Sequence, residues 1–290
     1  MHQCYNGGWH APLDNILQRT QYGYRAKRSA GRAVFAPSYA PCVGTLDLAT
    51  LAFDCEYAEA VAAIGGDWNF AGAATAGTGE VVLGPMHAEC VGIVSLAAGL
   101  ECIDVSALVG TMDGKFFAAA TAPNGLVVLA PYHAGCVGIV DAAARSVSCI
   151  DHGMGMVAAL FAGAATSSSG LVVLAPSHAN CVGLVDASAL SFTCLDLLPS
   201  WADNGGDLFR SAAATPSGEV VFSPYMADAV CVYSDLGPSV SCVDISSTLT
   251  MNDKFIGAAA SLSGVLVFSP LNADCFGEFD PATRPSSVTT

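Results

Sequence analysis

The sequence predicts an all-β fold, a six-bladed β-propeller, because three residue types recur at fixed spacing in six copies. Each copy carries a proline, a glycine six residues before it and an aromatic residue fifteen residues before it. Successive prolines are separated by 48, 46, 45, 48 and 46 residues, a period typical of propellers and solenoids. The columns are Pro37, Pro85, Pro131, Pro176, Pro224 and Pro270; Gly31, Gly79, Gly125, Gly170, Gly218 and Gly264; and Tyr22, Phe70, Phe116, Phe161, Phe209 and Phe255.

Four strands per repeat follow from the copy that begins at Phe116. Residues 116–122 and 126–130 are apolar runs joined by Pro123, Asn124 and Gly125, which form a tight-turn signal. A third run covers residues 136–140 and a fourth covers residues 146–151. Four short strands in this length are typical of one propeller blade.

The first strand of each repeat is rich in alanine and glycine, as in residues 70–75 and 116–121. First strands crowd around the axis of a propeller, so small side chains are expected there. The phenylalanine that begins each strand is predicted to wedge between blades.

The repeat resembles the β-propeller repeat superfamily in the broad sense that includes kelch, WD40 and NHL-like proteins. The loop at residues 130–139, Ala-Pro-Tyr-His-Ala-Gly-Cys-Val-Gly-Ile, also resembles an Ala-Pro-Tyr-Asn-Ala-Asp-x-Val-Gly-Val consensus of uncharacterised algal and bacterial repeat proteins. This resemblance covers nearly the whole chain. It implies a fold and no particular activity.

We therefore expect one domain over residues 1–290, with a fourth strand from the N-terminal segment completing the last blade. The predicted repeats cover residues 20–57, 68–106, 114–152, 159–198, 207–246, and 253–280 together with 1–6.

The twelve cysteines are ordered along the repeats. Ten of them form pairs 11–13 residues apart, which places the two members across one hairpin at disulfide distance. These predicted pairs are Cys42 with Cys55, Cys90 with Cys102, Cys136 with Cys149, Cys181 with Cys194, and Cys231 with Cys242.

Cys4 and Cys275 are left over, and they hold complementary strand positions at opposite ends of the chain. A bond between them would close the ring. Alternatively, residues 285–290 supply the fourth strand and leave both cysteines free, or the chain is a fragment of a larger propeller. Zinc is disfavoured because no Cys-x-x-Cys spacing occurs.

Localisation follows from the cysteines. Disulfides indicate an extracellular space or the lumen of the secretory pathway. No signal peptide is visible in the given sequence. A reduced cytoplasmic protein with twelve small buried thiols is the alternative.

Composition excludes some partners. The formal net charge is −15, with 25 acidic and 10 basic residues, so nucleic acid and anionic membranes should be repelled. No apolar run reaches the length of about 18 residues that spans a bilayer. A monomer that binds a protein, a small molecule or a glycan is expected.

Candidate ligand-face residues lie in two columns. The loop between strands two and three carries His87, His133 and His178, two residues after the proline, and imidazoles of this kind can bind a metal or hold their own loop. The linkers between blades carry carboxylates that either bind calcium, act as a base or shape the turn. These carboxylates are Asp67, Asp113, Asp207 and Asp253. A further column, Asp104, Asp151, Asp196 and Asp244, is expected to be solvated polarity at sheet edges.

Two breaks in the repeat stand out. Half of all basic residues fall between Arg19 and Arg32, and Arg25 and Lys27 alternate onto one face of a first strand. They are predicted to line the channel and bind an anion, or else to form salt bridges between blades. In the fifth repeat, two extra residues near residues 226–230 and Tyr233 in place of a glycine predict a protruding loop.

No known catalytic motif is present. The leading hypothesis is a non-catalytic binding or interaction scaffold that presents loops on one propeller face, and no cofactor is predicted. The alternative is a metal-assisted hydrolase or lyase with its site at the central funnel, where a divalent cation such as calcium would bind.

Overall fold

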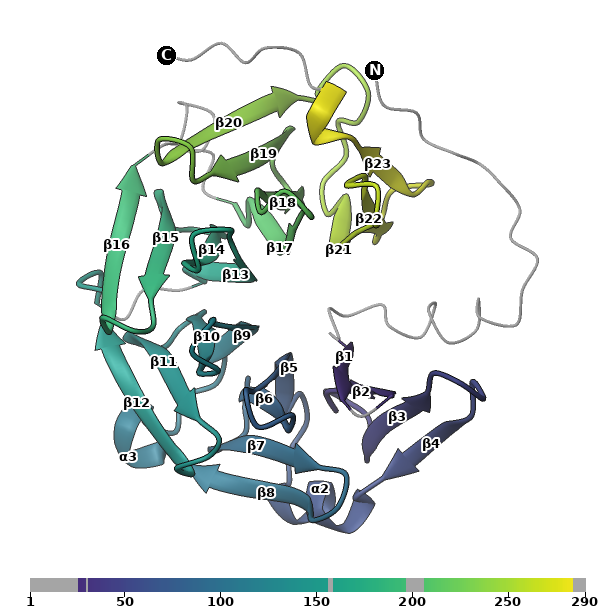
Figure 1. Cartoon of the computed structure of the whole chain (residues 1–290), viewed down its shortest axis with the longest axis vertical. Coiled ribbons are helices and arrows are strands. Elements are labelled where there is room, and N and C mark those ends of the chain that lie inside the picture. Colours follow the sequence, from purple (N-terminus) through teal and green to yellow (C-terminus); the bar gives the residue numbers. More distant parts are fainter. Residues whose placement is uncertain (1–25, 30, 156–158, 197–205, 284–290) are drawn as a thin grey trace. The chain divides into compact units, whose positions relative to one another are not determined.

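The computed structural model describes residues 26–29, 31–155, 159–196 and 206–283. Among them are six antiparallel sheets, five with four strands and one with three, and within each sheet the strands follow chain order (Figure 1). This architecture is the predicted six-bladed β-propeller. In the described ranges, no helix is long and apolar enough to cross a membrane.

The described chain divides into two compact units. One holds blades one to three, and the other holds most of blade four with blades five and six. The single domain over residues 1–290 that the sequence predicts stays a prediction.

The unit with blades one to three contains twelve strands and two short helices. Blade one is β1 (Ala26–Ser29), β2 (Arg32–Phe35), β3 (Val43–Asp47) and β4 (Phe53–Glu56). Blade two is β5 (Phe70–Thr75), β6 (Val81–Pro85), β7 (Cys90–Ser95) and β8 (Gly99–Asp104). Blade three is β9 (Phe116–Thr121), β10 (Val127–Pro131), β11 (Cys136–Asp141) and β12 (Ser146–Asp151).

The helices α2 (Ala58–Ile64) and α3 (Ser106–Val109) follow blades one and two. They have seven and four residues and leave the described fold nearly all-β, as predicted. The sequence of α2, Ala-Glu-Ala-Val-Ala-Ala-Ile, is rich in alanine, the strongest helix former.

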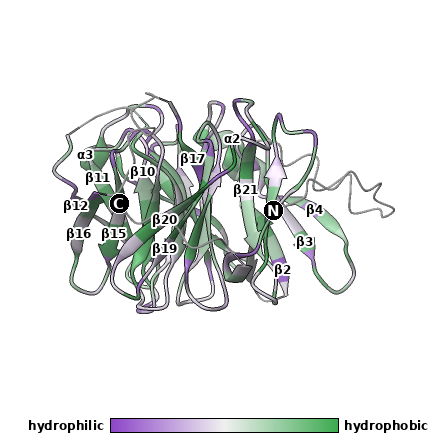
Figure 2. Cartoon of the chain, turned by 90° about the horizontal axis from the view of Figure 1, so that it is seen from above, coloured by the Kyte–Doolittle hydropathy of each residue, from purple (hydrophilic) through white to green (hydrophobic). Residues whose placement is uncertain are grey.

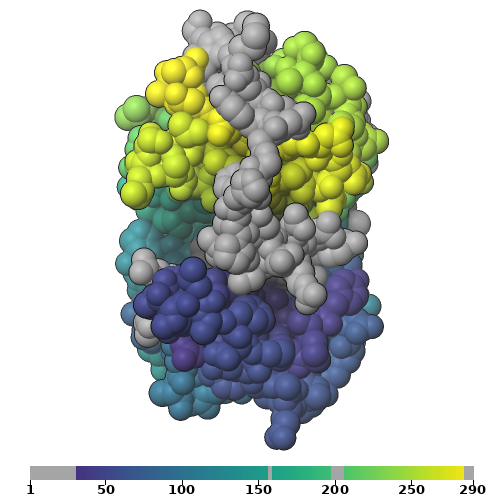
Figure 3. Space-filling view, turned by 90° about the vertical axis from the view of Figure 1, so that its right-hand side faces the viewer, coloured from purple at the N-terminus to yellow at the C-terminus, as the bar shows by residue number. Residues whose placement is uncertain are grey.

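The other unit carries the later blades. Blade four is β13 (Phe161–Thr166), β14 (Val172–Pro176), β15 (Cys181–Asp186) and β16 (Ser191–Asp196). Blade five is β17 (Phe209–Ala214), β18 (Val220–Pro224), β19 (Ala229–Ser234) and β20 (Ser239–Asp244). Blade six is β21 (Phe255–Ala260), β22 (Leu266–Pro270) and β23 (Gly277–Phe279), followed by the 3-10 helix η3 (Pro281–Thr283). The yellow surface of blade six lies beside the green surface of blade five (Figure 3), and β17 contacts β21.

The predicted closure of blade six falls outside the described residues. Cys275 is buried two residues before β23, but Cys4 and the rival segment 285–290 are not described. The bond between Cys4 and Cys275 and the N-terminal fourth strand therefore stay predictions.

The repeat columns have clear structural roles. Each described glycine of the glycine column has a φ between +81° and +92°, a conformation that other residues rarely adopt, and it closes the turn between the first two strands. Hydrophobic residues lie along the strands, and hydrophilic residues gather in the connecting loops (Figure 2). Phe116 is buried in a cluster that includes Val91 and Ile93 of blade two, as the predicted wedge between blades requires.

Five disulfides join the third and fourth strands of blades one to five, as predicted. In blades one to three the cysteines are diagonal rather than directly opposite. In blade three, for example, Cys136 lies opposite Asp151 and Cys149 lies opposite Gly138. The Cα atoms of the pairs in blades one to four are 5.4–5.5 Å apart.

Blade five differs, and here the predicted insertion is wrong. β19 begins five residues after Pro224, as β11 begins five residues after Pro131, so the loop is not longer. Instead, Cys231 occupies the glycine position of the third strand, lies directly opposite Cys242 and leaves their Cα atoms 4.1 Å apart. The sequence suggested an insertion because the cysteine had moved along the strand.

Candidate functional site

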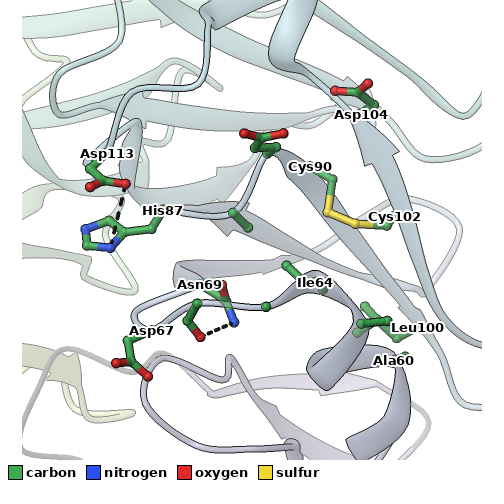
Figure 4. Close-up of a pocket in the computed structure, with 15 residues that line it drawn as sticks. Ala60, Ile64, Asp67, Asn69, His87, Cys90, Leu100, Cys102, Asp104 and Asp113 are labelled. Carbon is green, nitrogen blue, oxygen red and sulfur yellow. Dashed lines mark hydrogen bonds and ion pairs between the residues drawn. A yellow bond between two sulfur atoms is a disulfide. The ribbon is translucent and has the colours of Figure 1, made fainter.

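A groove of about 890 Å³ lies over blade two, at the end of the blade that carries the loop between strands two and three (Figure 4). One wall is α2 with the linker that follows it, and the other is the loop at residues 87–90 with the end of β8. The groove brings together three of the predicted ligand-face residues, His87, Asp67 and Asp113.

The linker turns sharply between Asp67 and Asn69 because Trp68 has a φ of +59°. Asp67 and Asn69 line the groove, whereas the Trp68 ring packs with a buried apolar cluster that includes Met86 and Phe117. Trp68 also makes an edge contact with the His87 ring, with 5.3 Å between ring centroids. The turn therefore directs Asp67 and Asn69 to the groove and Trp68 to a buried apolar cluster.

Asp113 connects two of the predicted histidines. Its carboxylate Oδ1 lies 3.9 Å from Nδ1 of His87, and its backbone carbonyl lies 3.0 Å from Nδ1 of His133. His133 also stacks on Tyr132. His133 therefore holds the linker of its own blade, and only His87 lines the groove.

His178 and Asp207 form a separate pair in the other unit. Nδ1 of His178 is 3.2 Å from Oδ1 of Asp207. Asp207 also accepts hydrogen bonds from the hydroxyl of Ser177 and from the guanidinium of Arg210. Asp207 thereby fixes the orientation of both the imidazole and the guanidinium.

Arg210 extends this network toward Asp253. Its guanidinium lies over the ring of Tyr225, 4.7 Å from the centroid. Burial raises the pKa of Tyr225 to about 12, and the neighbouring Asp253 carboxylate adds to this while the charge of Arg210 opposes it. The network combines three predicted residues with two that the sequence reading missed, Arg210 and Tyr225. Arg210 was detectable, because Ala71, Phe117, Ala162 and Ile256 hold its position in other repeats.

The predicted basic patch is not tested. Arg25 lies outside the described residues, and of Lys27 only the backbone is described, where it pairs with Val34. The anion-binding role of these two residues stays a prediction.

The histidine and aspartate columns do not form a metal centre in the described ranges, where no three His, Cys, Asp or Glu side chains are grouped to hold a metal ion.

Two lysines are completely buried, and the sequence reading missed both. Lys115 and Lys254 directly precede the phenylalanines of β9 and β21 and have no exposed surface. Lys115 donates a hydrogen bond to the carbonyl of His87, 3.2 Å away. Burial lowers the pKa of Lys115, and the charges of Asp113 and Glu89 oppose that effect.

Lys254 makes a similar arrangement at the junction between blades five and six. It donates to the carbonyl of Met226, 3.3 Å away, and forms an ion pair of 2.8 Å with Asp228. Met226 and Asp228 hold the positions that His87 and Glu89 hold in blade two. The sequence contained a signal for both lysines. Each stands directly before the phenylalanine of its repeat, and the preceding repeat has an acidic residue, Glu89 or Asp228, four residues after its proline.

The residues of the second acidic column are exposed at the ends of the outer fourth strands, as predicted, and three of them also take part in turns. Asp104, Asp151 and Asp244 each accept a hydrogen bond from the backbone N–H two residues later. The N–H of Ser106 holds the pKa of Asp104 below its usual value. These residues shape the turn that leaves each fourth strand, and Asp104 also lines the groove.

Comparison with known proteins gives structural similarity only. No protein-family model and no curated protein matches the sequence. A catalytically inactive histidine-to-alanine variant of virginiamycin B lyase from Staphylococcus aureus, with quinupristin, is 9% identical, with 87% of this chain and 78% of that chain covered and a TM-score of 0.67. A streptogramin B lyase is 11% identical over 88% and 77% of the two chains, with a TM-score of 0.68.

A chain of a mitotic checkpoint complex is also similar, with 12% identity over 89% and 75% of the two chains and a TM-score of 0.62. The neighbours therefore include enzymes and a protein from an assembly. At this identity the similarity shows the fold alone. By its own strands and by these neighbours, the chain is a β-propeller.

Proposed function

We propose that this chain is a non-catalytic binding module, and that the groove over blade two is its ligand site. The observation that carries the proposal is the groove itself, a concavity of about 890 Å³ with polar side chains converging on an apolar wall. Ligand sites in proteins commonly have this size and composition. The groove also lies at the loop end of the blade, which is the ligand face that the sequence predicts.

The engagement of the histidines supports the same function. His133 contacts a backbone carbonyl, and His87 and His178 each face one linker aspartate. Such contacts join a loop to a neighbouring linker and stiffen the face. A rigid face with adaptable side chains suits recognition, since binding residues are often placed on loops held by a scaffold.

A pair of variants on α2 tests the groove. Ala63 and Ala62 are neighbouring exposed residues of this helix, but only Ala63 lines the groove. The wild-type protein is screened against arrays of glycans, peptides and small molecules. We expect Ala63→Trp to fill the groove and abolish binding of the hits, and Ala62→Trp to leave binding within about twofold of wild type. Hits that are insensitive to Ala63→Trp, or the absence of any hit, would contradict the proposal.

A second candidate function is favoured by one observation, the pairing of His178 with Asp207. An aspartate that fixes one imidazole nitrogen leaves the other nitrogen able to act as a base. Two structural neighbours are lyases, and one of them is inactive with a single histidine replaced by alanine. This candidate is a lyase or hydrolase in which His178 is the base that takes a proton from the substrate.

Quinupristin tests this second candidate directly, because it is the compound named with one neighbour. The protein is incubated with quinupristin and the products are separated by chromatography. Turnover that is lost in His178→Ala and retained in His133→Ala would support an enzyme with His178 as base. If the wild-type protein leaves quinupristin unchanged, this form of the enzyme hypothesis is wrong.

A further inference from the structure

The disulfide of blade five has a different register from those of blades one to three. In these three blades the fourth-strand cysteine lies opposite a glycine, and its partner stands two residues before that glycine. In blade five, Cys231 itself occupies the glycine position and lies directly opposite Cys242. The place of Cys136 in blade three is held by Ala229. The chain therefore links third and fourth strands in two different backbone geometries.

The direct register brings the two strands unusually close. The Cα atoms of Cys231 and Cys242 are 4.1 Å apart, whereas those of the pairs in blades one to four are 5.4–5.5 Å apart. The Cα atoms of bonded cysteines usually lie about 4.4–6.8 Å apart, and directly opposite residues of an antiparallel pair lie about 4.5–5.5 Å apart. Opening the bond would let β19 and β20 relax to the ordinary spacing. A bond formed against the preferred spacing is more readily reduced.

The two cysteines of this bond differ in their exposure. Cys231 is completely buried in an apolar cluster that includes Leu184 of blade four and Phe209 of blade five. Cys242 is only partly buried beside the same cluster, and it belongs to β20, the outermost strand of its sheet. An incoming thiolate therefore reaches the sulfur of Cys242 rather than that of Cys231.

We propose that Cys231 and Cys242 form a redox-responsive disulfide, which a dithiol opens under milder conditions than the bonds of blades one to three, and that opening it frees β20 at the edge of its sheet. This exchange site goes beyond the binding function, because neither cysteine lines the groove over blade two.

The exchange is balanced when the reductant is a dithiol, either a small molecule or a protein. One thiolate of the reductant attacks the sulfur of Cys242, and the sulfur of Cys231 leaves as a thiolate and takes up a proton. The second thiol of the reductant then attacks the mixed disulfide and releases Cys242 as a thiol. Two electrons and two protons pass to the protein, and the reductant ends as its own disulfide.

Equilibration in mixtures of reduced and oxidised dithiothreitol tests the proposal. Free thiols are trapped by acid and alkylation, and each cysteine is quantified by peptide mass spectrometry. We expect Cys231 and Cys242 to become free together, with an equilibrium constant for reduction at least about tenfold above those of the pairs in blades one to three. Equilibrium is required, because the exposed Cys55 and Cys102 favour faster attack on their own bonds. Reduction of the blade-five pair together with the others, or after them, would overturn the proposal.

A double variant separates the register from the location of the bond. Ala229→Cys with Cys231→Gly moves the third-strand cysteine to the place of Cys136 and puts a glycine opposite Cys242. The new bond should be reduced with an equilibrium constant within about threefold of those in blades one to three. If the variant is reduced as readily as wild type, the register does not set the reducibility and the proposal is wrong.

Hydrogen exchange measures the release of β20. In the mixture that opens only the blade-five bond, the amides of β20 should exchange at least about tenfold faster than in the oxidised protein, since an edge strand loses its cross-link. The amides of β12, the equivalent strand of blade three, should keep their rates and serve as the control. Unchanged exchange in β20 would show that the bond opens without a structural response, and the proposed switch would be wrong.

Discussion

Replacing Gly72 by alanine is expected to lower the free energy of unfolding by about 3 kcal/mol or more, because the new methyl group would overlap fixed backbone atoms. A Cβ at Gly72 would lie 2.7 Å from the carbonyl carbon of Ala118 and 2.8 Å from the backbone nitrogen of Ala119. Both belong to β9, the first strand of the next blade. No side-chain rotation can relieve this contact, so β5 and β9 would have to move apart.

Gly84 provides the control in the same blade. A Cβ there would lie 3.4 Å from a methyl group of Leu129, an ordinary contact with a side chain. Alanine and serine hold the equivalent position in blades three, four, five and six, as Ala130, Ala175, Ser223 and Ser269. Gly84→Ala should therefore change the stability by less than about 1 kcal/mol. Urea denaturation with intact disulfides measures both variants, and equal effects would contradict the packing argument.

The close approach is built into the repeat. From the second repeat to the sixth, the Gly72 column holds Gly72, Ala118, Gly163, Ser211 and Gly257, so glycine alternates there with a slightly larger residue. In the other unit Gly163 repeats the contact, since its Cβ would lie 2.6 Å from the carbonyl carbon of Ser211. In each of these two contacts, a glycine of one first strand faces a residue with a small side chain on the next first strand. The missing side chain lets the two strands approach closely.

The blades were predictable because they depend on local and repeated signals. Each strand is marked by its own apolar run, and each first turn by a glycine that takes a positive φ. Spacing alone also predicted five disulfides, since hairpin partners are close in sequence. Blade five shows where this reasoning fails, because a cysteine that shifts along its strand resembles an insertion until the register of Cys231 with Phe222 is known.

The groove was only partly predictable. His87, Asp67 and Asp113 stood out as columns, but their meeting depends on the Trp68 turn and on α2, both of which belong to a single linker. The positive φ of Trp68 recurs at Gly114, Ala159 and Asp253, but these residues share no side-chain type, so self-comparison of the sequence could not reveal the turn. Arg210, Lys115 and Lys254 were overlooked for other reasons. Arg210 is an exception within an apolar column. Lys115 and Lys254 belong to a mixed column of polar residues and leucines, and their partners lie in the preceding repeat.

Truncating Lys254 to alanine is expected to lower the free energy of unfolding by about 2–4 kcal/mol, because a completely buried side chain is lost together with its polar contacts. The side chain of Lys254 has no exposed surface and begins blade six. Its ammonium group contacts the carbonyl of Met226 and the carboxylate of Asp228, both in blade five. Alanine would leave a cavity at this junction.

The repeat supplies the matched control, since Leu208 occupies the equivalent buried position before β17. Lys254→Leu keeps most of the volume and removes the buried charge, and the stability should then stay within about 1 kcal/mol of wild type. Asp228 is 55% exposed, so the carboxylate left behind remains solvated. Thermal and urea denaturation of the two variants separate volume from charge. If leucine destabilises the protein as much as alanine does, the ammonium contacts with blade five, rather than the filled space, hold this junction together.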